Sequence, residues 1–238
     1  MTKYEEFRRG QPRVTERFPD LAPPLAFLGD QQDAHFRLVH RLLGTAQDQG
    51  STPLFSVDIV LMSVINRSLD LIDGFLATYD RWNLSTAAPQ VRMQVDNLLR
   101  VTLLHLAPAG SVTDMLLSGE RLSKSVDPLA PAGKNFKLTD QRLREHAAPM
   151  FDWLDLVYEK ASGWVHFSGV HIGVTMQVDD AGKIEGRFPS DIDRYSYEFL
   201  EQVLWAMNQA THGVLEVIAT FAAGKEAAAS GWERLPGA

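Results

Sequence analysis

The chain has 238 residues, 45% of them hydrophobic, which is enough for one large domain with a continuous core. Its 23 basic and 30 acidic residues give a net charge of -7, which argues against an extended nucleic-acid-binding surface but allows a local basic pocket. The absence of cysteine excludes disulfide bonds and thiolate metal sites, and it favours a cytoplasmic location.

The sequence contains no segment that we expect to cross a membrane. Its first ten residues lack the apolar core of a signal peptide. The most apolar window, Leu54–Tyr79, contains Asp58, Arg67, Asp70 and Asp73, and charges of this kind are costly inside a bilayer. We therefore predict a cytoplasmic protein without membrane contacts.

Three regions are predicted along the chain. Residues 1–30 are polar and interrupted by prolines, so we expect an N-terminal arm that lies on the surface or is partly disordered. Residues 31–223 are predicted to form a single helical domain. The Ala- and Gly-rich residues 224–238 are expected to form a disordered tail, because Gly224 ends the last helical pattern.

Apolar residues recur at helical spacing along most of the predicted domain. The expected helices cover residues 31–43, 56–80, about 86–106, 112–122, 139–145, about 149–162 and about 190–221. The second of these is apolar over most of its circumference, so we expect it to be the central helix. Its residues Arg67 and Asp70, spaced i,i+3, can pair.

The hydrophobic period changes from helical to alternating at Val170. Every second residue from Val170 to Val178 is apolar, Asp179–Gly182 has the composition of a turn, and residues 183–188 can return as a second strand. The predicted fold is therefore mainly α: a bundle of about six or seven helices with one β-hairpin, at about 170–188, inserted before a long C-terminal helix.

The junction between the helical and alternating patterns carries the first candidate site. Tyr158, Lys160, Ser162 and His166 are the candidate catalytic residues, because a histidine beside hydroxyl groups can act as a general acid or base. The nearby Lys can stabilise a phosphate or an oxyanion. The alternative is structural: Ser162 ends the helix, and the histidines bond to backbone carbonyl groups.

The helix over residues 86–106 carries the second candidate site. Arg92, Asp96 and Arg100 lie at i, i+4 and i+8, which we call the arginine stripe, with Asn97 beside it. One interpretation is an anion-binding pocket in which Asp96 holds two guanidinium groups in place. The other is a salt-bridged helix surface. The predicted ligand-binding residues are Arg67, Arg92, Asp96, Asn97, Arg100 and His171.

We predict no metal site and no cofactor. His166, His171 and His212 lack a further His or carboxylate at the spacing typical of metal ligands. The sequence contains no phosphate-binding glycine loop, nucleophile elbow or zinc signature.

Several blocks of the sequence carry a resemblance to known proteins. Asn66–Leu69, the RxxxDNLLR pattern of Arg92–Arg100, and the YExxSGxxHxSxxH pattern that begins at Tyr158 resemble an uncharacterised family of bacterial all-helical proteins. More distantly, a helical bundle whose late helix ends in Ser-x-x-x-His is similar to HEPN-type domains. That resemblance implies a protein directed at RNA or nucleotides, in a defence or toxin–antitoxin setting.

The active motif of HEPN-type RNases is an Arg followed, after four to six residues, by a His. The junction has Lys160 rather than Arg before His166, and Lys lacks the planar fork of Arg. Arg142 precedes His146 by one residue too few. Arg100 and His105 meet the spacing, but on one continuous helix they point to different sides.

Three functions are therefore open: a HEPN-like protein that acts on RNA or nucleotides, a non-catalytic interaction module, or a protein or enzyme for a small anionic ligand. The second would be a homodimer, since Ala206, Ala210 and Gly213 allow close approach of another helix. For the third, we predict that the arginine stripe faces Tyr158, Ser162 and His166 across a shared polar pocket. Its excess positive charge would attract an anion.

Overall fold

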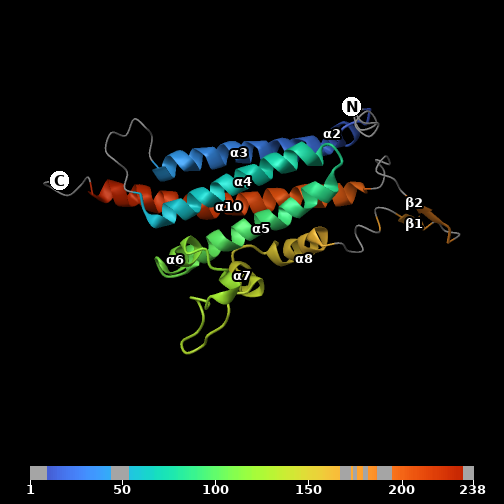
Figure 1. Ribbon diagram of the computed structural model, residues 1–238. Helices are drawn as coiled ribbons and strands as arrows, with labels where there is room; N and C mark the ends of the chain where they lie inside the picture. Colours follow the sequence, from blue (N-terminus) through green and yellow to red (C-terminus); the bar gives the residue numbers. More distant parts are fainter. Residues whose placement is uncertain are drawn as a thin grey trace.

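The computed structural model of the protein describes residues 10–43, 54–166, 173, 176–178, 182–186 and 195–232. The structure is mainly α, as predicted (Figure 1). Its α-helices are α2 (Val14–Arg17), α3 (Ala22–Leu43), α4 (Ser56–Tyr79), α5 (Leu84–Leu106), α6 (Ser111–Leu117), α7 (Asp140–Ala147), α8 (Leu154–Val165) and α10 (Tyr197–Trp232). Two 3-10 turns, η1 (Pro19–Leu21) and η2 (Leu122–Lys124), lie between them.

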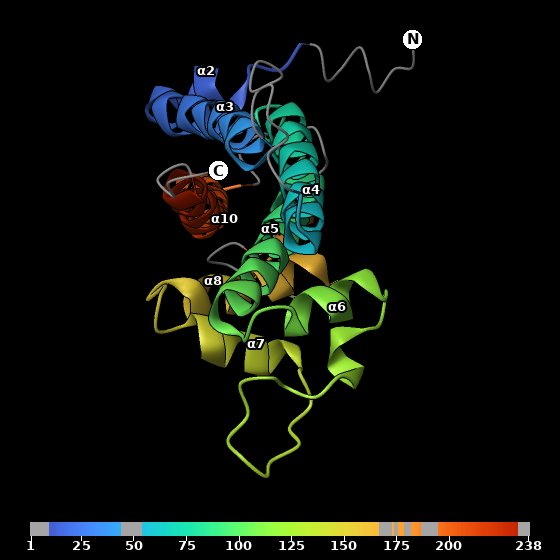
Figure 2. The same ribbon diagram turned by 90° about the vertical axis from the view of Figure 1, so that its left-hand side faces the viewer.

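Four long helices, α3, α4, α5 and α10, pack around one hydrophobic core (Figure 2). Helices α4 and α10 each pack against both α3 and α5. Helices α3, α5 and α10 run in the same direction along the bundle, and α4, which packs between α3 and α5, runs in the opposite direction (Figures 1 and 2). The hydroxyl of buried Tyr79, at the end of α4, donates to the backbone carbonyl of Leu200 at 2.8 Å and so ties α4 to α10.

Helix α5, rather than the predicted α4, contacts the most other helices: α4, α6, α7, α8 and α10. One side of α5 faces the bundle, while α6, α7 and α8 pack on its other side (Figure 2). The sequence pattern understates its burial because Gln94, Asn97 and Thr102 are polar yet buried. Buried polar residues need hydrogen-bond partners that a periodicity argument does not reveal.

The N-terminal part of the structure corrects the prediction of a surface or disordered arm. Helix α3 begins at Ala22, and Pro23 and Pro24 lie in its first turn, where no intrahelical amide donor is needed. Before it, the Val14 amide donates to the carbonyl of Asp80 at 3.0 Å, and the Val14 side chain is buried. Residues 22–30 therefore belong to a helix of the bundle and not to an arm, while residues 1–9 lie outside the described part.

The C-terminal helix also differs from the prediction. Helix α10 begins at Tyr197, continues through Gly224 and ends at Trp232, so the predicted disordered tail is helical up to that residue. Lys225 explains the continuation: its Nζ donates to the Leu42 carbonyl and pairs with buried Asp58, each at 2.6 Å. A tertiary contact thus outweighs the weak helix propensity of one glycine.

The small residues on α10 are buried inside the chain. Ala206 and Ala210 are in the core, and a Cβ atom on Gly213 would lie 3.0 Å from a methyl group of Leu98. These residues let α10 approach α5 closely, so they do not supply the surface expected for a homodimer. Dimerisation stays a prediction, but these residues no longer support it.

Two short strands lie between α8 and α10. β1 (Met176–Val178) and β2 (Ile184–Gly186) pair antiparallel, with Met176 opposite Gly186. Most of the residues 170–188 in which the hairpin was predicted lie outside the described residues. Within the described part of the chain, no helix has the length and apolar character that a membrane span needs.

Candidate functional site

An open pocket of about 350 Å³ lies where α4, α5, α7 and α8 meet. It brings together most of the residues that the sequence singled out, from the arginine stripe, from α4 and from the end of α8. The lining residues are Arg67, Arg92, Met93, Asp96, Asp140, Tyr158, Ser162, Val165 and His166.

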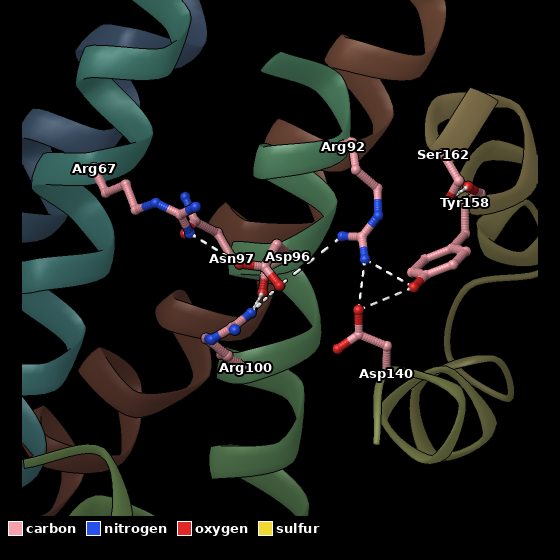
Figure 3. A network of polar contacts seen from close by, with 8 residues as sticks. All are labelled: Arg67, Arg92, Asp96, Asn97, Arg100, Asp140, Tyr158 and Ser162. Atoms are coloured by element: carbon pink, nitrogen blue, oxygen red, sulfur yellow. Dashed lines mark hydrogen bonds and ion pairs between the residues drawn. The ribbon is translucent and has the colours of Figure 1, made fainter. Parts of the chain in front are cut away.

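Asp96 is the centre of the charged part of the pocket. Its carboxylate pairs with Arg100 one turn later on α5, and its Oδ1 lies 3.9 Å from Nη1 of Arg92 one turn earlier. A third guanidinium reaches it from α4, since Nη1 of Arg67 donates to its Oδ2 at 3.2 Å (Figure 3). The predicted i,i+4 stripe is therefore present, and Arg67 pairs with Asp96 rather than with Asp70.

Arg92 links Asp96 to the opposite wall of the pocket. Its Nη2 donates to the Tyr158 hydroxyl at 2.7 Å and to Oδ2 of Asp140 at 2.8 Å (Figure 3). The Tyr158 hydroxyl donates its one hydrogen to the same Asp140 oxygen at 3.1 Å. The guanidinium carbons of Arg92 and Arg144 lie 4.1 and 4.5 Å from the centre of the Tyr158 ring, within cation–π range.

The environment keeps the Tyr158 hydroxyl protonated. Burial raises the pKa of Tyr158, and the neighbouring Asp140 carboxylate raises it further, while Arg92 acts in the opposite direction. Tyr158 is therefore a hydrogen-bond donor in this pocket at neutral pH and not a base.

A chain of buried hydrogen bonds holds Arg67 from behind. Nη1 of Arg67 donates to Oδ1 of Asn97, and Nδ2 of Asn97 donates to Oε1 of Gln94 at 3.1 Å. Nε2 of Gln94 then donates to the hydroxyl of Ser68, which lies 2.8 Å from Nε2 of buried His35. We call Asn97, Gln94, Ser68 and His35 the core hydrogen-bond chain.

The direction of this chain follows from its last member. Nδ1 of His35 lies 2.8 Å from the backbone carbonyl of Gln31, which can only accept. Nδ1 therefore carries the hydrogen, and Nε2 accepts from Ser68. Desolvation by burial lowers the pKa of His35 to about 4, so the ring is neutral at pH 7. Each residue of the chain, starting with Arg67, therefore donates to the next one in the direction of His35.

Several predicted site residues do not line the pocket. Lys160 is a correction: its Nζ donates to Oε1 of Gln202 on α10 at 2.9 Å, away from the pocket. Asn97 is buried behind Arg67, and Arg100 reaches the pocket only through Asp96. His171 lies outside the described residues.

Asp140 is the main pocket residue that sequence reasoning missed. It is the first residue of α7, a short helix capped by Thr139, whose hydroxyl accepts from the Arg142 amide at 3.4 Å. A Thr-Asp pair before a helical segment predicts such a start, but nothing in its spacing shows which helix it faces. The pocket residues Met93 and Val165, and Arg144 beside Tyr158, were missed for the same reason.

Buried Asp127 fixes α7 and the loop before it. Its Oδ2 accepts from Nη2 of Arg142 at 2.9 Å and lies 2.8 Å from Nε2 of His146. Burial alone would raise the pKa of Asp127, but hydrogen bonds from the Leu129 amide, His146 and Arg142 hold it below its ordinary value. Arg142 and His146 are thus engaged in an internal contact outside the pocket.

The charged residues that line the pocket, Arg67, Arg92, Asp96 and Asp140, carry two positive and two negative charges. Arg100, which pairs with Asp96 from outside the lining, leaves the whole charged cluster with one excess positive charge. This excess favours an anionic ligand.

Among the described residues, no group of three or more His, Cys, Asp and Glu side chains is arranged to hold a metal ion. The pocket presents guanidinium, phenol and imidazole groups to its interior. The chain matches no protein-family model, no curated protein and no solved structure.

Proposed function

We propose that the protein binds a small organic anion in the pocket between α4, α5, α7 and α8. The observation that carries this proposal is that the guanidinium groups of Arg67 and Arg92 line one open cavity, in a charged cluster that has one excess positive charge once Arg100 is included. Its volume of about 350 Å³ falls in the range of pockets for small-molecule ligands.

The lining residues indicate how such a ligand is held. Arg67 uses Nη1 for its bonds to Asp96 and Asn97, and 40% of its side chain is exposed, so its other donors can reach a ligand. His166 offers a further polar group at the end of α8. The exposed side chains of Met93 and Val165 give the pocket an apolar wall, which favours a ligand with an apolar or planar part.

The experiment is a calorimetric titration of the protein with benzoate, inorganic phosphate and AMP. We expect binding of at least one of them, and we expect Arg92→Gln to weaken it by about tenfold or more, as for a charge-assisted hydrogen bond. Arg41→Gln is the matched control, because Arg41 is an exposed arginine that pairs with Glu226 away from the pocket. Equal affinity in both variants, or no binding of any probe, would refute the proposal.

A HEPN-like role in binding or cutting RNA or nucleotides is the second candidate. One observation favours it: Arg67 and Arg92 share a pocket with His166, which places Arg and His together in space without the linear motif. Tighter binding of AMP than of benzoate would favour this candidate. If the protein cleaves a labelled oligoribonucleotide and His166→Ala does not, the protein is an RNase. If neither protein cleaves it, the role is limited to binding RNA or nucleotides.

A further inference from the structure

The Asp140 carboxylate already sits on the donors that an anionic ligand would use. We propose that Asp140 is a built-in competitor: its carboxylate occupies the place that the carboxylate of the ligand takes on Arg92 and Tyr158. This inference rests on the proposed function, and it names the chemical class of the ligand as an organic carboxylate.

The geometry around Oδ2 of Asp140 supports this assignment. That single oxygen accepts from Nη2 of Arg92 at 2.8 Å and from the Tyr158 hydroxyl at 3.1 Å (Figure 3). The two donors are held in place. The Arg92 side chain is only 15% exposed, packs over the Tyr158 ring and forms an ion pair with Asp96. Two such converging donors suit one oxygen of an anion, and in this structure that oxygen belongs to a carboxylate.

The Asp140 side chain can move away from Arg92 and Tyr158 without disturbing the fold. Its side chain is 54% exposed, and it is the first residue of α7. Helix α7 does not depend on the contact with Arg92, because Thr139 caps its first turn and Asp127 anchors Arg142 and His146. An exposed carboxylate at a helix N-terminus is also stabilised by the helix dipole when it turns toward solvent.

Competition with Asp140 restricts the ligands that can bind. A carboxylate tethered beside its site acts at an effective concentration on the order of millimolar. A free anion that contacted only Arg92 and Tyr158 would therefore displace it poorly. A successful ligand needs further contacts, and Arg67 on one side and the apolar wall of Met93 and Val165 on the other supply them. An organic acid with an apolar body meets this requirement better than inorganic phosphate.

The test compares Asp140→Asn with wild-type protein in titrations with benzoate and with inorganic phosphate. Removal of the competing carboxylate should tighten benzoate binding by about tenfold, because Arg92 and Tyr158 are released and the local charge rises. Phosphate should gain less, since it cannot use the apolar wall. In both proteins we expect a higher affinity for benzoate than for phosphate. A higher affinity for phosphate would make the ligand a phosphate and overturn the carboxylate assignment.

Asp155→Asn is the matched control. It removes the same charge from α8, where Asp155 lies 3.8 Å from Arg144 and does not line the pocket. We expect its benzoate affinity to stay within about twofold of wild type, as for an exposed charge screened by salt. An equal gain in both variants would mean that net charge alone is responsible, and the inference would fail.

The remaining outcomes are equally decisive. Weaker binding in Asp140→Asn would make Asp140 part of the ligand site and refute the competition, while leaving the proposed function intact. Binding by neither protein would refute both. Asp140→Ser provides a second variant with a good helix-terminal residue, and thermal melts check that each variant is folded before titration.

Discussion

Asp96 holds three guanidinium groups with one partly buried carboxylate, so its removal should be costly to the fold. We expect Asp96→Ala to lower the free energy of unfolding by about 2 kcal/mol, because Arg67, Arg92 and Arg100 lose their common partner and repel one another. Urea denaturation measures this loss. Asp155→Ala, which removes the exposed partner of Arg144, should change the value by less than about 0.5 kcal/mol. Similar values for the two variants would contradict the central role of Asp96.

His35 gives the stability a pH dependence. Its pKa is lowered to about 4 in the folded protein, against a value of 6.5 for a free imidazole, so the unfolded chain binds more protons between these two values. The contribution of neutral His35 is therefore complete above pH 6.5 and is lost as the pH falls toward 4. We expect a loss of about 2–3 kcal/mol from this residue between pH 7 and pH 4.5.

The measurement is a series of urea denaturation curves at pH 7, 5.5 and 4.5, in wild type and in His35→Gln. The variant keeps a polar amide at position 35 but has no titrating group there in this pH range. Its unfolding free energy should fall less steeply with decreasing pH. Parallel curves for the two proteins would show that His35 is not responsible.

At the scale of elements, the core hydrogen-bond chain connects α3, α4 and α5 to the pocket. Ser68→Ala removes the link between Gln94 and His35 and leaves both the Gln94 amide and Nε2 of His35 without this partner. We expect a loss of about 1–2 kcal/mol in unfolding free energy. We also expect faster hydrogen exchange at the Arg67 guanidinium, measured by arginine-selective NMR, because Asn97 and Gln94 then hold it less firmly.

Tyr79→Phe is the control for this prediction. It removes one buried hydrogen bond, to the Leu200 carbonyl, at a site outside the core hydrogen-bond chain. It should lower stability by a similar amount, about 1 kcal/mol, without changing exchange at Arg67. A change at Arg67 in both variants would indicate general loosening of the bundle.

Two glycines on α10 should respond differently to substitution by alanine. A Cβ atom at Gly224 meets nothing within 4 Å, so Gly224→Ala should raise stability by about 0.5–1 kcal/mol through helix propensity. At Gly213 the added atom would lie 3.0 Å from Leu98 and 3.2 Å from Phe151, so the crowding should cancel or reverse that gain. Thermal melts of the two variants measure the difference, and an equal gain would show that α10 can move away from α5.

Sequence periodicity predicted the elements better than their ends. The apolar spacing of α4 and α5 is sufficient to place both helices, because burial on a helix repeats every three or four residues. The ends at Ala22 and Trp232 depend on contacts that are distant in sequence, such as Lys225 with Asp58. No local pattern contains that information.

The candidate site was predictable where its residues share one helix face. Tyr158 and Ser162 are four residues apart and both line the pocket, whereas Lys160 lies half a turn away and faces α10. Helical geometry alone could therefore have removed Lys160 from the candidates. The contribution of Asp140 could not have been predicted, because the position of α7 is set by the buried contacts of Asp127.

At the scale of the whole molecule, the pocket spans a boundary between two layers. Arg67, Arg92 and Asp96 come from the four-helix bundle, while Asp140, Tyr158 and Ser162 come from the helices that pack on the outer side of α5. A ligand that contacts residues of both layers would hold the two layers together. Its binding energy would then oppose separation of the two layers, so a saturating ligand should raise the melting temperature of the protein.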